Sequence, residues 1–132
     1  MAGEPILVVD DNPANVRLVQ FLLTKRGYDV RVAMDASAAL EVLGNFTPKL
    51  VLMDLQLPGM DGLELTRKIK AEARFADLPI IAVTAFAMKG DEQRAREAGC
   101  DGYVTKPIDT RTLPKLIADY LAGDRPKAPE AP

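Results

Sequence analysis

Carboxylate side chains follow two short apolar runs that have the composition of buried strands. The run at residues 6–9 is followed by Asp10 and Asp11, and the run at residues 50–53 is followed by Asp54. Continuous apolar runs of this length are typical of parallel strands that helices cover on both faces. Ligands of such sheets bind beyond the carboxyl ends of the strands, so these carboxylates stand where chemistry is expected.

Three carboxylates in one crevice repel one another, so the site requires a bound cation or raised pKa values. Mg²⁺ meets this need through one or two carboxylates, water and commonly a phosphate oxygen, and Mn²⁺ or Ca²⁺ can take the same oxygen ligands. Thr84, at the end of the predicted fourth strand, and Lys106, just beyond the predicted fifth, would add a hydroxyl and an ammonium group. A metal, an ammonium group and a hydrogen-bond donor around an oxygen nucleophile can stabilise a phosphoryl group during transfer. A carboxylate can be that nucleophile, and Asp54 is the best candidate because it stands alone on the predicted central strand.

The elements that must position these residues follow from hydrophobic periodicity and from capping residues. Pro13 suits the first turn of a helix, apolar residues recur at helical spacing over residues 16–23, and Gly27 would close that helix. Asp35 is a candidate N-cap for the next helix. Strands are predicted at residues 6–9, 28–33, 50–53, 80–84 and 102–105, and further helices at residues 36–43, 63–71, 91–98 and from about 112 to 121.

Five strands that alternate with five helices predict a doubly wound parallel α/β sheet with helices on both faces. Right-handed crossovers favour the flavodoxin-like strand order 2-1-3-4-5. In that order the first and third strands are neighbours, which would bring the three carboxylates together. We expect one domain over residues 5–122. Residues 123–132 contain three prolines and no apolar pattern beyond alanine, and they predict a disordered tail.

Composition narrows the classes of function. The chain of 132 residues has a formal net charge of −2, which argues against a nucleic-acid-binding surface. It has no histidine, which excludes histidine-liganded metals and histidine acid–base catalysis, and its single cysteine, Cys100, is expected to be a small buried hydrophobe. Neither a signal peptide nor a membrane-spanning run is recognisable, so we expect a cytoplasmic protein.

In this order and spacing, the motifs resemble the signature of bacterial two-component response-regulator receiver domains, and the similarity covers about residues 5–121. The segment at residues 82–91 is similar to single-domain cell-cycle regulators and to the receivers of hybrid kinases and diguanylate cyclases. The motifs that carry the resemblance are Asp10-Asp11, Asp54 with Pro58-Gly59 behind it, Thr84-Ala85 and Lys106-Pro107.

The resemblance implies that Asp54 accepts a phosphoryl group from the phosphohistidine of a sensor histidine kinase or of a histidine phosphotransfer protein. It also implies that Asp11, the Asp54 carboxylate and the backbone carbonyl of Gln56 bind Mg²⁺ directly, with Asp10 acting mainly through water. The chain would then be a signalling module and not an enzyme, with self-phosphorylation and self-dephosphorylation as its only chemistry.

The resemblance further implies a switch. Lys106 would pair with Asp54 and then with a phosphoryl oxygen, while Thr84 and Tyr103 would move inward, although an edge-strand aromatic such as Tyr103 is also a common packing residue. Phe86 and Gln56 lie where members of this family tune dephosphorylation, and the hypothesis for this chain is that a bulky Phe86 hinders the attacking water. Kinase specificity would be read partly from residues 14–22, and a downstream protein target would bind the fourth helix, fifth strand and fifth helix, with no role for nucleic acid or membrane.

Two other functions share parts of this pattern. Phosphatases and phosphotransferases of the haloacid dehalogenase type also use a strand-end aspartate with Mg²⁺ and lysine, but they resemble one another in a second aspartate two positions later, where this chain has Gln56. A flavodoxin-like flavin carrier would need a phosphate-binding loop after the first strand, and Asp10 and Asp11 would repel a phosphate there. The receiver is therefore the preferred interpretation.

Overall fold

The structure is a computed structural model that describes residues 3–57, 59–85 and 90–122. Strands and helices alternate as expected, and the predicted bounds of the strands and of the last four helices lie within one residue of those observed. A short 3₁₀ turn, η1, was not expected. The predicted tail at residues 123–132 and the role of Phe86 lie outside the described residues. The elements are β1 (Pro5–Val9), α1 (Pro13–Lys25), β2 (Asp29–Ala33), α2 (Ala36–Leu43), β3 (Leu50–Asp54), α3 (Gly62–Lys70), η1 (Ala73–Phe75), β4 (Ile80–Thr84), α4 (Asp91–Ala98), β5 (Gly102–Thr105) and α5 (Thr112–Leu121).

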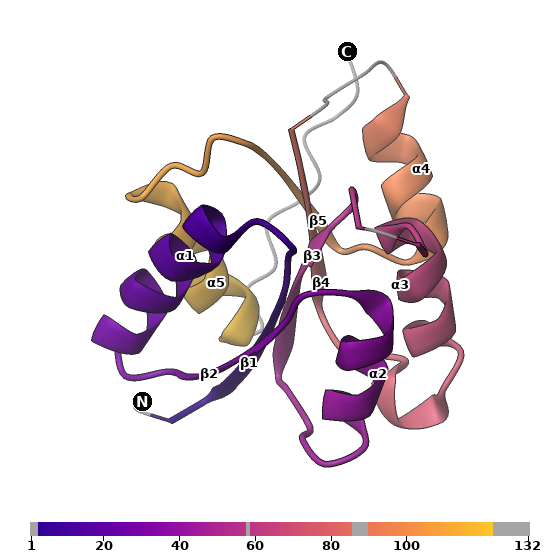
Figure 1. Cartoon of the computed structure of the whole chain (residues 1–132), viewed down its shortest axis with the longest axis horizontal. Helices are drawn as coiled ribbons and strands as arrows, with labels where there is room; N and C mark the ends of the chain where they lie inside the picture. Colours follow the sequence, from indigo (N-terminus) through magenta and orange to yellow (C-terminus); the bar gives the residue numbers. More distant parts are fainter. Residues whose placement is uncertain (1–2, 58, 86–89, 123–132) are drawn as a thin grey trace.

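The five strands form one parallel sheet in the order β2-β1-β3-β4-β5, which confirms the expected topology. Helices α1 and α5 cover one face of the sheet, and α2, α3 and α4 cover the other (Figure 1). No helix in the described part of the chain is both long and apolar enough to cross a membrane.

The continuous apolar strands divide their side chains between two cores. On β3, Leu50 and Leu52 belong to the core beneath α1 and α5. The alternate residues Val51 and Met53 belong to the core beneath α2, α3 and α4. Because successive side chains of a strand point to opposite faces, Asp54 shares the side of Leu52, where both line one small cavity.

Local capping sets where the helices near the strand ends begin. The Asn12 side chain accepts hydrogen bonds from the backbone N–H groups of Ala14 and Asn15, and Pro13 stands in the first turn of α1. Asp35 caps α2 as expected, by accepting from Ala38 N–H. Both helices therefore begin within four residues of the end of the preceding strand.

Gly62 allows α3 to begin directly against the end of β3. A Cβ atom at Gly62 would lie 2.3 Å from the Asp54 carbonyl oxygen and 2.8 Å from Leu55 Cα. Alanine normally favours a helix over glycine by about 0.5–1 kcal/mol, but overpacking against rigid backbone costs about 1–3 kcal/mol. We therefore expect Gly62→Ala to lower the free energy of unfolding by about 1–2 kcal/mol in urea denaturation. Gly44→Ala is the control, because its nearest contact is 3.2 Å; equal stability losses in both variants would contradict the steric explanation.

Candidate functional site

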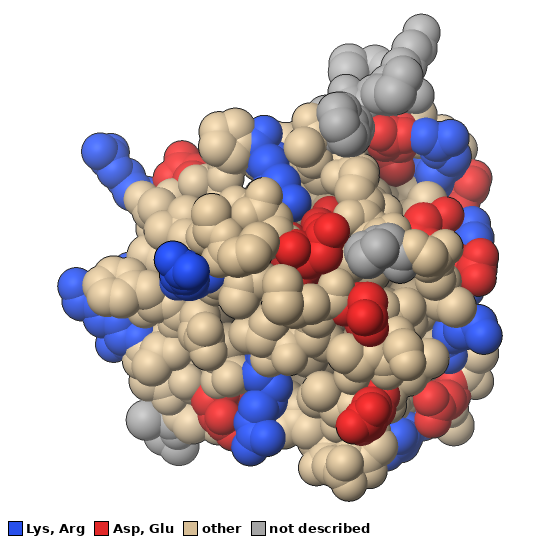
Figure 2. All heavy atoms as spheres, viewed as in Figure 1, with Lys and Arg blue, Asp and Glu red and all other residues tan. Residues whose placement is uncertain are grey.

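Three carboxylates meet at the carboxyl edge of the sheet. Val9 and Met53 are paired in register, so the residues that follow them, Asp10 and Asp54, lie side by side. One ligand oxygen each from Asp10, Asp11 and Asp54 lies within 4.8 Å of the others. Asp10 and Asp54 are only 5% and 2% exposed, whereas Asp11 is exposed. Figure 2 shows acidic atoms in the middle of this view and basic atoms spread around its margin.

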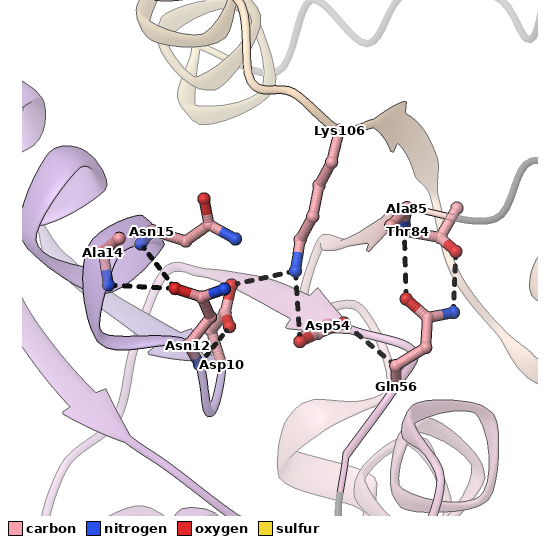
Figure 3. Close-up of polar contacts among 9 residues, drawn as sticks. All are labelled: Asp10, Asn12, Ala14, Asn15, Asp54, Gln56, Thr84, Ala85 and Lys106. Atoms are coloured by element: carbon pink, nitrogen blue, oxygen red, sulfur yellow. Dashed lines mark hydrogen bonds and ion pairs between the residues drawn. The ribbon is translucent and has the colours of Figure 1, made fainter.

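Lys106 supplies the cation that the buried carboxylates require. It follows β5, and its Nζ lies 3.3 Å from Asp54 Oδ2 and 3.5 Å from Asp10 Oδ2 (Figure 3). The lysine side chain is itself only 14% exposed. The expected pairing of Lys106 with Asp54 is thus present, and the ammonium group bridges the ends of β1 and β3.

The Asp54 carboxyl has a raised pKa of about 6, against an ordinary value of 3.8. Burial is the main cause, since apolar side chains line the cavity beside it, and the neighbouring Asp10 carboxylate adds to the rise. The Gln56 N–H, which donates to Asp54 Oδ1 at 2.9 Å, and the Lys106 ammonium oppose the shift. Burial thus disfavours the charged form of Asp54, and a ligand that adds positive charge would stabilise that form.

The donor set fits a divalent metal ion. One ammonium group faces three carboxylates, so full ionisation leaves two negative charges without a partner among these four groups. Carboxylate oxygens are the ligands that Mg²⁺, Mn²⁺ and Ca²⁺ prefer. Asp10, Asp11 and Asp54 would hold the ion, and the contribution of the Gln56 carbonyl oxygen stays a prediction.

Thr84 lies at the end of β4 and contacts Gln56. The Gln56 side-chain amide donates from Nε2 to Thr84 Oγ1 at 2.7 Å and accepts from Ala85 N–H at 3.2 Å. The sequence interpretation gave the backbone carbonyl of Gln56 a role at the metal and its position a role in tuning dephosphorylation, but it did not foresee this side-chain contact. The pairing of Asp54 with Val83 places Gln56 opposite Ala85, a register that only the structure provides.

Two further candidate residues have their polar atoms buried. The Tyr103 hydroxyl has no hydrogen-bond partner among the residues that the structure describes, and the switch role of Tyr103 stays a prediction. Cys100 is buried as expected, and burial raises the pKa of its thiol to about 11, which leaves it protonated and unreactive at neutral pH.

Comparisons with known proteins relate this chain to a single protein family. Residues 6–118 match the model of the response regulator receiver domain. Over 119 residues the chain is 41% identical to the polar-differentiation response regulator DivK of Brucella anthropi, and the match covers 90% of this chain and 96% of that protein. This result confirms the expected resemblance to response-regulator receiver domains.

Solved structures agree with the fold. A CheY-like response regulator receiver domain protein from Methanospirillum hungatei is 31% identical, covers 93% of this chain and 97% of its own, and has a TM-score of 0.86. The receiver domain of the sensor histidine kinase PA1611 from Pseudomonas aeruginosa is 34% identical, covers 92% of this chain and 99% of its own, and has a TM-score of 0.84. That structure is described with a magnesium ion coordinated in the active-site cleft.

Proposed function

The chain belongs to the response regulator receiver domain family, and we propose that it accepts a phosphoryl group on Asp54 from a histidine kinase or a histidine phosphotransfer protein. One observation carries the proposal. A buried carboxylate at the end of the central strand is held by the Lys106 ammonium beside two further carboxylates. That arrangement joins a nucleophile to the positive charge that phosphoryl transfer needs.

The transfer uses this chain's own groups in defined roles. An Asp54 carboxylate oxygen attacks the phosphorus of the donor phosphohistidine, a P–O bond forms as the P–N bond breaks, and the donor histidine retains the electron pair and takes a proton. Lys106 then moves its hydrogen bond from Asp54 to a phosphoryl oxygen. The Thr84 hydroxyl donates to another phosphoryl oxygen.

Mg²⁺ is the cofactor that we propose, held directly by Asp11, Asp54 and the Gln56 carbonyl oxygen, with Asp10 acting mainly through water. When bound, the ion offsets the negative charge that develops on the phosphoryl oxygens. The charge imbalance of the site and the magnesium ion of the related PA1611 receiver domain support this choice.

We propose that the domain over residues 5–122 signals in the cytoplasm through protein contacts alone. The kinase or phosphotransfer protein docks on α1, where the ring of Phe21 is exposed beside Lys25 and a shallow groove of about 500 Å³ runs along the helix. The downstream target binds the surface of α4, β5 and α5. In this proposal Tyr103, on β5, follows Thr84 inward when Asp54 is phosphorylated.

Acetyl phosphate, a small-molecule phosphoryl donor, tests the chemistry without a kinase. With Mg²⁺ we expect intact mass spectrometry to show one phosphoryl adduct, which peptide mapping places on the segment that contains Asp54. A matched sample with excess chelator should show none. An adduct that forms equally without a divalent ion, or that maps elsewhere, would refute the proposed site.

A further inference from the structure

The Gln56 side chain crosses from the loop after β3 to the end of β4 and holds two neighbouring groups there. Its amide donates to Thr84 Oγ1 and accepts from Ala85 N–H. Figure 3 shows the amide beside both groups, with the Thr84 hydroxyl oxygen turned away from Lys106. The same residue contacts Asp54 through its backbone N–H. Gln56 therefore connects the proposed phosphoryl acceptor with Thr84, which the proposed function places against the phosphoryl group, and with the backbone N–H of the next residue, Ala85.

The direction of these hydrogen bonds follows from the chemistry of the groups. Ala85 offers only an N–H donor at this point, so the amide oxygen of Gln56, and not its nitrogen, must face it. The amide nitrogen then faces Thr84 Oγ1, which acts as acceptor. Both ends of the amide are thus used, so moving the Gln56 side chain away from β4 breaks both contacts.

We propose that the Gln56 amide is a placeholder for the phosphoryl group. It occupies Thr84 and Ala85 while Asp54 is unmodified, and it leaves both when Asp54 carries the group. The inference rests on the proposed function, in which Asp54 is the acceptor. Gln56 is accordingly a positioning residue, because it acts on the phosphoryl group through Thr84 and Ala85.

The exchange has a physical basis. The Ala85 N–H has one proton, so it can donate strongly to a phosphoryl oxygen only after the Gln56 oxygen gives way. Thr84 must likewise turn from the amide toward Asp54. Hydrogen bonds to a charged phosphoryl oxygen are about twice as strong as those between neutral groups, which drives the replacement. The amide contacts that must be broken weaken phosphoryl binding by about tenfold.

Two variants of similar length separate hydrogen bonding from shape. Gln56→Met fills the space but removes both hydrogen bonds, whereas Gln56→Glu keeps an acceptor for Ala85 N–H and another for the Thr84 hydroxyl. The probe is beryllofluoride with Mg²⁺, a mimic of the phosphoryl group, titrated by calorimetry. We expect Gln56→Met to bind beryllofluoride about tenfold more tightly than the wild-type chain does. Gln56→Glu should bind it no more tightly than the wild-type chain. Gln20→Met, at an exposed glutamine on α1, should leave the affinity unchanged.

Nuclear magnetic resonance of the ¹⁵N-labelled chain gives a readout that a merely structural role would not move. On addition of beryllofluoride and Mg²⁺, the Gln56 side-chain amide signals should shift to the values of exposed glutamines and lose protection from hydrogen exchange. If the chain binds the probe while these signals stay unchanged, or if Gln56→Met binds it no more tightly, the placeholder is refuted and the proposed function stands. If the chain does not bind the probe at any Mg²⁺ concentration, the proposed function fails and the placeholder fails with it.

Discussion

Asp54→Asn is expected to abolish the phosphoryl adduct completely, because the amide oxygen of asparagine is too weak a nucleophile to attack phosphorus. The variant keeps an oxygen that can accept from Gln56 N–H, so the loop after β3 retains its conformation. Intact mass after incubation with acetyl phosphate and Mg²⁺ is the measurement. Asp29→Asn, on the exposed start of the edge strand β2, is the control, and it should be phosphorylated to the same extent as the wild-type chain.

The same variant is expected to raise stability in the absence of metal. Because the folded-state pKa of Asp54 is raised to about 6, the folded protein binds more protons than the unfolded chain between about pH 4 and pH 6. The stability of the unmodified chain therefore falls as the pH rises through that window and stays lower above it. At pH 7 Asp54→Asn should gain about 1–3 kcal/mol in the free energy of unfolding, and the gain should vanish below about pH 4.

Urea denaturation of both proteins in chelator at several pH values measures this difference. Adding Mg²⁺ should stabilise the unmodified chain more than the variant, since the metal relieves a repulsion that the variant has already lost. A variant that is less stable than the parent at pH 7 would show that the Lys106 pairing outweighs the cost of burying the Asp54 charge.

Lys106→Met is expected to slow phosphorylation by acetyl phosphate about hundredfold, a loss typical of removing one positioned donor from a charged transition state. The Lys106 ammonium already lies 3.3 Å from Asp54 Oδ2, on a mostly buried side chain, so it requires little reorganisation as charge develops. Single-turnover mass spectrometry at saturating Mg²⁺ measures the rate. Lys115→Met, at an exposed lysine on α5, should leave the rate unchanged.

Removing the ammonium group also leaves two buried carboxylates facing each other. We expect Lys106→Met to lose about 2 kcal/mol of stability at pH 7 without metal, because an unpaired buried charge is costly. The loss of stability should be smaller near pH 5, where Asp54 is protonated. Saturating Mg²⁺ should restore most of the lost stability. A normal rate combined with lower stability would mean that Lys106 serves the fold and not the transfer.

The apolar runs of the three central strands, β1, β3 and β4, together with the alternation of strand and helix patterns, are enough to predict the fold. Four or five consecutive apolar residues cannot leave one side in water, so each such strand has to lie between two layers of helices, and short connections then favour a parallel sheet with this strand order. The same reasoning brings Asp10, Asp11 and Asp54 together, because acids that end neighbouring parallel strands share one edge. These features depend on local pattern and on general packing rules.

Contacts between residues far apart in the chain could be identified only from the tertiary structure. The contact of Gln56 with Thr84 and Ala85 depends on the register of β3 with β4, and a shift of one residue would turn the side chain to the other face. The clash at Gly62 depends on how closely α3 approaches β3. The raised pKa of Asp54 depends on how much apolar surface closes around it. Sequence periodicity assigns residues to a face of the sheet, but only the packed structure sets the distances that decide charge and hydrogen bonding.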